Sequence, residues 1–158
     1  MKKVCLLLRC STSVQDYEYQ RNTLTDICNR NGWEIVHTVE NKVSGAKKNE
    51  ERSEIVELLD FVKNNKIDKI LCTEISRLGR STLEALKVIE TLNEVGVCLY
   101  LANYGLETLT KDGKVNPTCH LLCTILLEVA QMERSIIRNR MSMGYQDYLN
   151  KRKQDKEN

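Results

Sequence analysis

Apolar residues along this chain form either short runs or longer segments in which they recur every three or four positions. Residues 4–8, 69–73 and 97–102 are runs of strand length, and residues 33–39 alternate as a strand does. The segments between them, 15–31, 53–64 and 81–96, have helical spacing. Strands that alternate with helices predict an α/β fold with a mostly parallel, doubly wound sheet and helices on both faces.

Three segments have no such periodicity and are predicted as loops. Residues 41–52 are highly charged and are expected to form a mobile loop, and residues 76–80 follow the third strand. Residues 104–116 form the third loop, with a short edge strand near 106–109. Ser81 and Glu84 have the spacing of a capping box, which places the start of the third helix at Ser81.

The last segment is the longest. From Pro117 to about residue 152 there is no further proline and one glycine, with apolar residues at helical spacing. A helix of this length spans roughly 50 Å, more than a domain of this size can cover. We expect its outer half to project, so that an apolar stripe needs another subunit to bury it: Val129, Met132, Ile136 and Met143. The alternative is that this stripe packs on the sheet of its own chain.

The composition is that of one soluble domain. The chain has 158 residues, of which 41% are hydrophobic and 29% charged, and we divide it into a core (1–116), the long helix (117–152) and a basic tail (153–158). A net charge of +2 gives little evidence for nucleic acid; residues 133–158 carry +3, from seven basic and four acidic side chains, so the rest carries −1. No signal peptide or membrane span is expected.

The cysteines and histidines indicate neither zinc nor disulfides. Seven cysteines occur without any CxxC pair, and the chain has two histidines. We therefore expect no metal and no cofactor, and a reduced, cytoplasmic protein whose cysteines pack in the core.

Candidate chemistry lies directly after the first strand. Ser11 follows Arg9 in the turn that leads into a helix, where ligands of open α/β sheets and phosphate groups bind. Arg77 and Arg80 leave the third strand, which neighbours the first in the doubly wound order, and Arg52 ends the charged loop. Guanidinium groups bind phosphate oxygens and can stabilise a pentavalent transition state without a metal. The alternative for Ser11 is a helix cap without chemistry.

Three motifs resemble those of a known family. RCSTS with two following glutamines, SRLGRS, and ILLEVAQMERSIIRNRMSMG are similar, in this order, to the catalytic domain of serine site-specific recombinases, the resolvase and invertase group. The resemblance covers nearly the whole chain and implies a resolvase-like α/β fold of flavodoxin-like strand order. It also implies that Ser11 attacks a DNA phosphodiester, forms a 5′-phosphoserine linkage, and is released when strands are exchanged and resealed, without metal or ATP.

The resemblance also implies roles for other positions. It places arginines and glutamines around the scissile phosphate (Arg9, Arg52, Arg77, Arg80, Gln15 and Gln20) and long-helix arginines at the DNA (Arg134, Arg138 and Arg140). Asn41 and Ser76 stand where many members have aspartate. The implied partners are double-stranded DNA and a homodimer through the long helix, a tetramer when active, with a DNA-binding domain that is separate or cut away.

Two other functions remain open for the sequence. The first is a catalytically silent oligomerisation or regulatory domain of the same fold. The second is a small flavodoxin-like domain that binds a phosphate-containing ligand, which would require a defined small-molecule pocket.

Overall fold

A computed structural model describes residues 1–10, 14–42, 53–78 and 82–157. These residues form a five-stranded sheet of order β2-β1-β3-β4-β5, so the predicted neighbourhood of the first and third strands is confirmed. The pairs β1–β2, β1–β3 and β3–β4 are parallel, and β4–β5 is antiparallel. The strands are β1 (Lys3–Cys10), β2 (Glu34–Lys42), β3 (Lys69–Cys72), β4 (Cys98–Leu101) and β5 (Leu106–Glu107).

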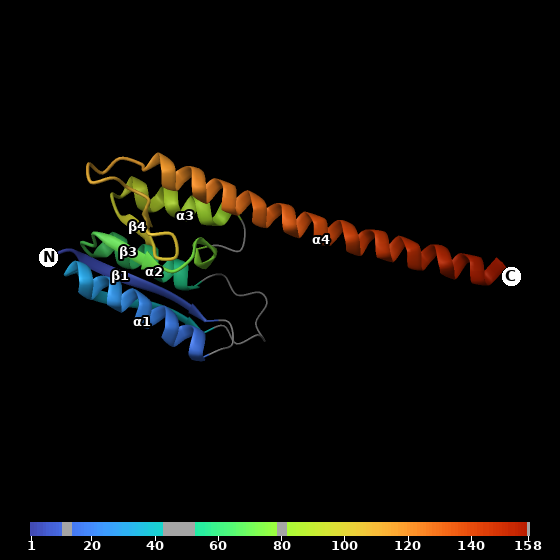
Figure 1. The fold of residues 1–158 in the computed structure, drawn as a ribbon, viewed down its shortest axis with the longest axis horizontal. Coiled ribbons are helices and arrows are strands. Elements are labelled where there is room, and N and C mark those ends of the chain that lie inside the picture. Colours follow the sequence, from blue (N-terminus) through green and yellow to red (C-terminus); the bar gives the residue numbers. More distant parts are fainter. Residues whose placement is uncertain (11–13, 43–52, 79–81, 158) are drawn as a thin grey trace.

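Helices cover both faces of the sheet, as predicted (Figure 1). Helix α1 (Val14–Asn31) packs on one face against Val4, Leu6 and Leu8. Helices α2 (Ser53–Asn64) and α3 (Thr82–Glu94) pack on the other face, where Cys5 and Leu7 point. Strand β1 is therefore buried on both sides, which explains its continuous apolar run.

Some element boundaries differ from the prediction. Strand β2 extends to Lys42, so Asn41 lies in a strand and not in a loop, because its backbone pairs with Arg9 of β1. The segment after β3 begins as a short 3₁₀ helix, η1 (Ile75–Arg77), instead of an irregular loop. Residues 43–52 of the predicted mobile loop and the predicted cap Ser81 lie outside the described residues.

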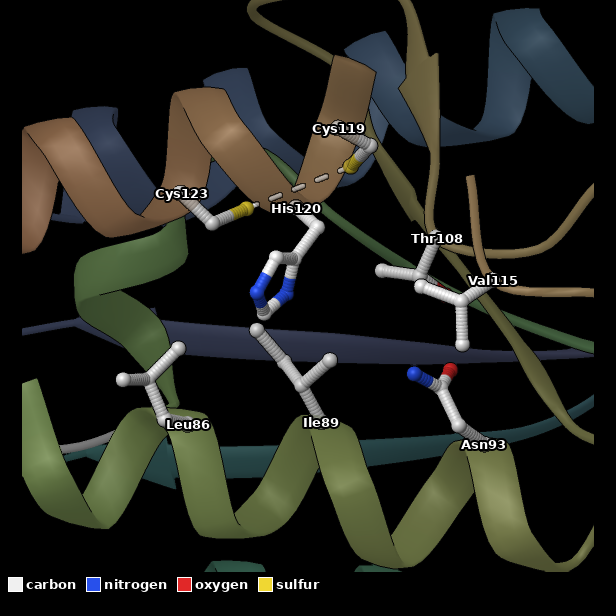
Figure 2. A pocket seen from close by; sticks show the side chains of 8 residues that line it. All are labelled: Leu86, Ile89, Asn93, Thr108, Val115, Cys119, His120 and Cys123. Atoms are coloured by element: carbon white, nitrogen blue, oxygen red, sulfur yellow. Dashed lines mark hydrogen bonds between the residues drawn. The ribbon is translucent and has the colours of Figure 1, made fainter. Parts of the chain in front are cut away.

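Helix α4 (Pro117–Glu157) is 41 residues long and projects from the body (Figure 1). Its first turns pack beside α3 through Cys119, Cys123 and Leu127. Figure 2 shows Cys119 and Cys123 on α4 above Leu86 and Ile89 of α3. Every side chain described from 128 to 148 is exposed. The stripe Val129, Met132, Ile136 and Met143 is 47%, 61%, 48% and 69% exposed, so it does not pack on the sheet of its own chain. The helix also continues through residues 153–157, which were predicted as a separate basic tail but carry two basic and two acidic side chains.

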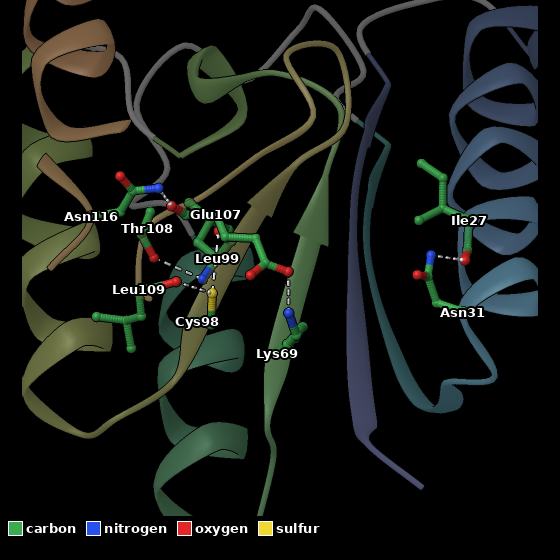
Figure 3. Close-up of polar contacts among 9 residues, drawn as sticks. All are labelled: Ile27, Asn31, Lys69, Cys98, Leu99, Glu107, Thr108, Leu109 and Asn116. Carbon is green, nitrogen blue, oxygen red and sulfur yellow. Dashed lines mark hydrogen bonds and ion pairs between the residues drawn. The ribbon is translucent and has the colours of Figure 1, made fainter. Parts of the chain in front are cut away.

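At the amino ends of the strands, Lys69 is buried and paired with a carboxylate. Its side chain is 6% exposed and forms an ion pair with Glu107 of β5 (Figure 3). The Lys69 ammonium also lies 4.7 Å from the ring centroid of Trp33. The side-chain Nδ2 of Asn116 donates to the Glu107 carbonyl oxygen, 2.9 Å away. Asn116 Oδ1 accepts from the backbone N–H of Thr118, and this hydrogen bond caps α4. The edge strand is thus held both to β3 and to the start of α4.

The cysteines described by the structure lie in the core as free thiols, as the sequence predicted (Cys5, Cys28, Cys72, Cys98, Cys119 and Cys123). Burial raises the pKa of Cys5 and of Cys72 to about 12, so both thiols stay protonated at neutral pH. In the described part of the chain no helix is long and apolar enough to cross a membrane.

Candidate functional site

The carboxyl ends of β1 and β3 bring together two of the predicted arginines. Arg9 lies near the end of β1, and Arg77 lies in η1, directly after β3. Because these strands are parallel neighbours, their carboxyl ends meet at one edge of the sheet. Arg77 Nη1 donates a hydrogen bond to the Arg9 carbonyl oxygen over 3.2 Å, which joins two residues 68 positions apart.

Gln20 fixes the end of β1 from the other side. Its side chain is almost fully buried under α1, where Nε2 donates to the Arg9 carbonyl oxygen (2.7 Å) and Oε1 accepts from the Arg9 amide (3.2 Å). The pairing of β1 with β3 ends at Leu6 and Leu71, so the backbone of Arg9 extends beyond its neighbour on that side. Buried backbone groups need partners, and Gln20 supplies them here.

Asp16 completes this cluster and was not among the residues predicted from the sequence. Its Oδ2 accepts from Gln20 Nε2 (3.0 Å) and lies 3.7 Å from Arg77 Nη2. Asp16 precedes Gln20 by four residues, a spacing at which Gln and Asp side chains interact on a helix. That spacing was the available signal, but it does not reveal that an arginine from another element reaches the same carboxylate.

A second polar group lies beside η1. The Glu74 carboxylate accepts hydrogen bonds from Ser76 Oγ (3.1 Å) and from Asn103 Nδ2 (3.2 Å). Ser76 is therefore bound to a carboxylate from its own segment. These contacts connect η1 to the segment that follows β4, and so help to place Arg77.

The guanidinium of Arg77 is held largely inside the protein. Its side chain is 18% exposed, and its Nε is buried with no hydrogen-bond partner among the described residues. Cys72 lies near enough for the charge of Arg77 to lower its pKa, but burial outweighs this effect. The cluster thus consists of the largely buried Arg77 guanidinium, the half-exposed Asp16 carboxylate, and the Gln20 side-chain amide, which anchors the end of β1.

The other predicted site residues fall into two groups. Ser11, Arg52 and Arg80 lie outside the described residues. Gln15 is exposed in the first turn of α1, and the long-helix arginines are exposed on the projecting part of α4, away from the sheet (Arg134, Arg138 and Arg140; Figure 1). Of the predicted set, the structure brings Arg9, Gln20 and Arg77 together.

A small pocket between α3 and the base of α4 contains none of the predicted residues. It is lined by residues that include Asn93, His120, Cys119 and Cys123, and the two sulfur atoms lie 3.9 Å apart (Figure 2). The hydrogen bond with the Cys123 thiol, together with burial, raises the pKa of Cys119. Within the described ranges no group of three His, Cys, Asp or Glu residues could hold a metal ion.

Comparison with known proteins shows the family to which the chain belongs. Residues 4–155 match the family model described as "Resolvase, N terminal domain". The transposon Tn1546 resolvase of Enterococcus faecium is 30% identical over 137 residues, which are 87% of this chain and 65% of that protein. The serine recombinase PinR of Escherichia coli K12 is 27% identical over 146 residues, 91% of this chain and 69% of that protein. The chain therefore spans about two thirds of the length of these relatives.

Solved structures agree with this result. A resolvase family site-specific recombinase from Streptococcus pneumoniae has a TM-score of 0.65 at 25% identity, over 91% of this chain and 95% of that one. The N-terminal catalytic domain of TP901-1 integrase has a TM-score of 0.60 at 26% identity, over 85% of this chain and 98% of that one.

Proposed function

The chain belongs to the resolvase family, and from that premise we propose that it is the catalytic domain of a serine site-specific recombinase, a DNA strand transferase. The observation that carries the proposal is the hydrogen bond from Arg77 to the Arg9 carbonyl oxygen. It anchors two guanidinium-bearing residues at the end of β1, and Ser11 follows Arg9 by two residues in the sequence.

The proposed reaction is transesterification at phosphorus. The Ser11 hydroxyl loses its proton and attacks a DNA phosphodiester, so that a 5′-phosphoserine bond forms and the 3′ oxygen leaves as a hydroxyl. In strand exchange, a 3′-hydroxyl from another cut end attacks the phosphoserine and expels the serine oxygen, which recovers its proton. Each step exchanges one phosphoester for another, and no nucleotide is consumed.

The arginines supply the charge that this reaction needs. We propose that Arg9 and Arg77 act from the cluster, that Arg80 and Arg52 join them, and that Gln15 and Gln20 shape the site. Guanidinium groups donate parallel hydrogen bonds to phosphate oxygens and stabilise the additional negative charge of the transition state. Buried Gln20 contributes by position, since its hydrogen bonds hold the strand end that leads to Ser11.

The proposed partners are double-stranded DNA and further copies of the chain. Exposed apolar positions along α4 support a homodimer through this helix, with a tetramer as the active form. The exposed Arg134, Arg138 and Arg140 are proposed to contact DNA. A net charge of +2 favours weak, salt-sensitive affinity, so we propose that a separate region supplies sequence-specific binding.

A covalent-adduct assay tests this function. The chain is fused to a zinc-finger domain of known specificity and incubated with DNA in which two of its binding sites flank a randomised centre. We expect a denaturant-resistant protein–DNA adduct whose 5′ end is blocked and whose 3′ end can be extended by a polymerase. The variant Ser11→Ala should abolish the adduct, whereas Ser13→Ala, the matched control in the same segment, should keep it.

The adduct assay, together with measurements of self-association and melting temperature, separates the other functions. No adduct from the wild-type fusion, with self-association intact, would support a catalytically silent oligomerisation domain. A rise in melting temperature with a nucleotide but not with DNA would support a domain that binds a small phosphate ligand. An adduct that persists in Ser11→Ala would refute the role of this serine.

A further inference from the structure

We propose that Asp16 is an internal competitor of DNA phosphate: it pairs with Arg77 before DNA binds and so limits the affinity of the site for a phosphodiester. This inference deepens the proposed function and rests on it for the identity of the anion. The observation behind it is that one carboxylate oxygen of Asp16 lies 3.7 Å from Arg77 Nη2 and also accepts from Gln20.

The contacts of Arg77 distinguish a fixed side of its guanidinium from an exchangeable one. Nη1 donates to a backbone carbonyl of β1, which remains in place as long as the sheet is folded. Nη2 faces a carboxylate on a side chain that can rotate. A phosphodiester also offers negatively charged oxygens that accept from a guanidinium, so it can replace Asp16 at Nη2 while Nη1 stays bound.

Burial favours the same order of events. The Arg77 side chain is 18% exposed, whereas that of Asp16 is 41% exposed. Asp16 is therefore the partner that can turn towards solvent, with the loss of its hydrogen bond to Gln20, while the cation remains where the strand ends. Asp16 also lies in the first turn of α1, where the helix dipole favours negative charge, and a phosphate at this place would meet repulsion from a carboxylate that stayed.

The expected effect is modest because the carboxylate is partly solvated. Breaking an ion pair that is exposed to solvent changes an equilibrium constant roughly two- to fivefold. Removal of the Asp16 charge should therefore tighten phosphate binding, whereas loss of a residue that only supports the fold should weaken it. The sign of the change thus distinguishes the two roles.

The test measures binding without cleavage. All proteins carry Ser11→Ala, and fluorescence anisotropy gives the Kd for a short labelled duplex of arbitrary sequence at several low salt concentrations. Asp16→Asn keeps an oxygen for Gln20 and removes the charge; Asp16→Ser is the second variant. Glu18→Gln is the matched control, because it removes the same charge from an exposed position two residues further along α1.

We expect Asp16→Asn to lower Kd roughly two- to fivefold more than Glu18→Gln does. In a background that carries Arg77→Gln, this extra gain should vanish, because the competing pair no longer exists. Equal effects of the two α1 variants, a gain that persists without Arg77, or weaker binding by both Asp16 variants at unchanged melting temperature would overturn the inference. The result does not depend on Ser11 chemistry, so failure here and failure of the adduct assay are distinguishable.

Discussion

Removing the charge of Glu107, the partner of buried Lys69, should strongly lower the free energy of unfolding of this domain. In Glu107→Gln, the Lys69 ammonium, whose side chain is 6% exposed, keeps a neutral acceptor and loses its counter-charge. Removing one partner of a buried pair costs about 3 to 5 kcal/mol, and we expect about 2 to 3 kcal/mol here because the Glu107 side chain is 31% exposed and partly solvated.

Urea denaturation followed by fluorescence measures this loss directly. Trp33 is the only tryptophan and lies against Lys69, so its emission reports on the same cluster. For a domain of this size the predicted loss lowers the melting temperature by about 4 to 12 °C. The matched control is Glu57→Gln, whose partner His37 is 32% exposed and which should cost less than about 1 kcal/mol.

A double variant separates the pair from the packing around it. Replacing both partners by apolar residues, as in Lys69→Met with Glu107→Leu, should recover most of the stability that Glu107→Gln loses. The reasoning is refuted if Glu107→Gln costs no more than Glu57→Gln, or if the double variant is less stable than Glu107→Gln alone.

Three further predictions follow from other parts of the structure. Gln20→Ala should lower the free energy of unfolding by about 2 kcal/mol and abolish adduct formation, because the end of β1 loses its hydrogen-bond partners. Gln15→Ala, at an exposed position, should leave the free energy of unfolding unchanged. Urea titration measures the stability of both variants, and the adduct assay measures the activity of Gln20→Ala. Ile136→Asp should leave the melting temperature of the body unchanged but reduce self-association in analytical ultracentrifugation, since this side chain is 48% exposed. Burial raises the pKa of Cys5 and Cys72 from 9.0 to about 12. The stabilisation from their protonated thiols is therefore complete below pH 9 and is lost as the pH rises towards 12. Urea midpoints measured against pH should show this decline, and Cys72→Ala should flatten it.

Much of the fold could be predicted from local patterns. The buried run of β1, the helical spacing of α1 and α2, and the length of the last helix, which has one glycine and no proline after Pro117, each reflect one element and its surroundings. That the first and third strands are neighbours followed from the general topology of alternating strands and helices, and the flavodoxin-like order of the whole sheet was implied by the family resemblance. Boundaries were less accurate where tertiary pairing decides them: Asn41 belongs to β2 because its backbone meets Arg9, which no local pattern shows.

The candidate site was predictable in its residue types but not in its contacts. Arg9, Gln20 and Arg77 were identified from motifs, and their convergence depends on β1 and β3 ending at the same edge. Asp16 was missed because its importance arises from a side chain 61 positions further along, and helical spacing alone gives many acid–amide pairs with no such neighbour. The predicted roles of Ser11, Arg52 and Arg80 remain predictions.

The unsupported length of α4 links the shape of one chain to the presence of another. Beyond Leu127 the helix continues for about 45 Å, and its described side chains from 128 to 148 are exposed. In proteins most helical stability comes from the packing of an apolar face, and the apolar stripe of this segment is exposed in the single chain. Helix formation in this segment and its association with another molecule should therefore be coupled, so that the helical signal in circular dichroism rises with protein concentration.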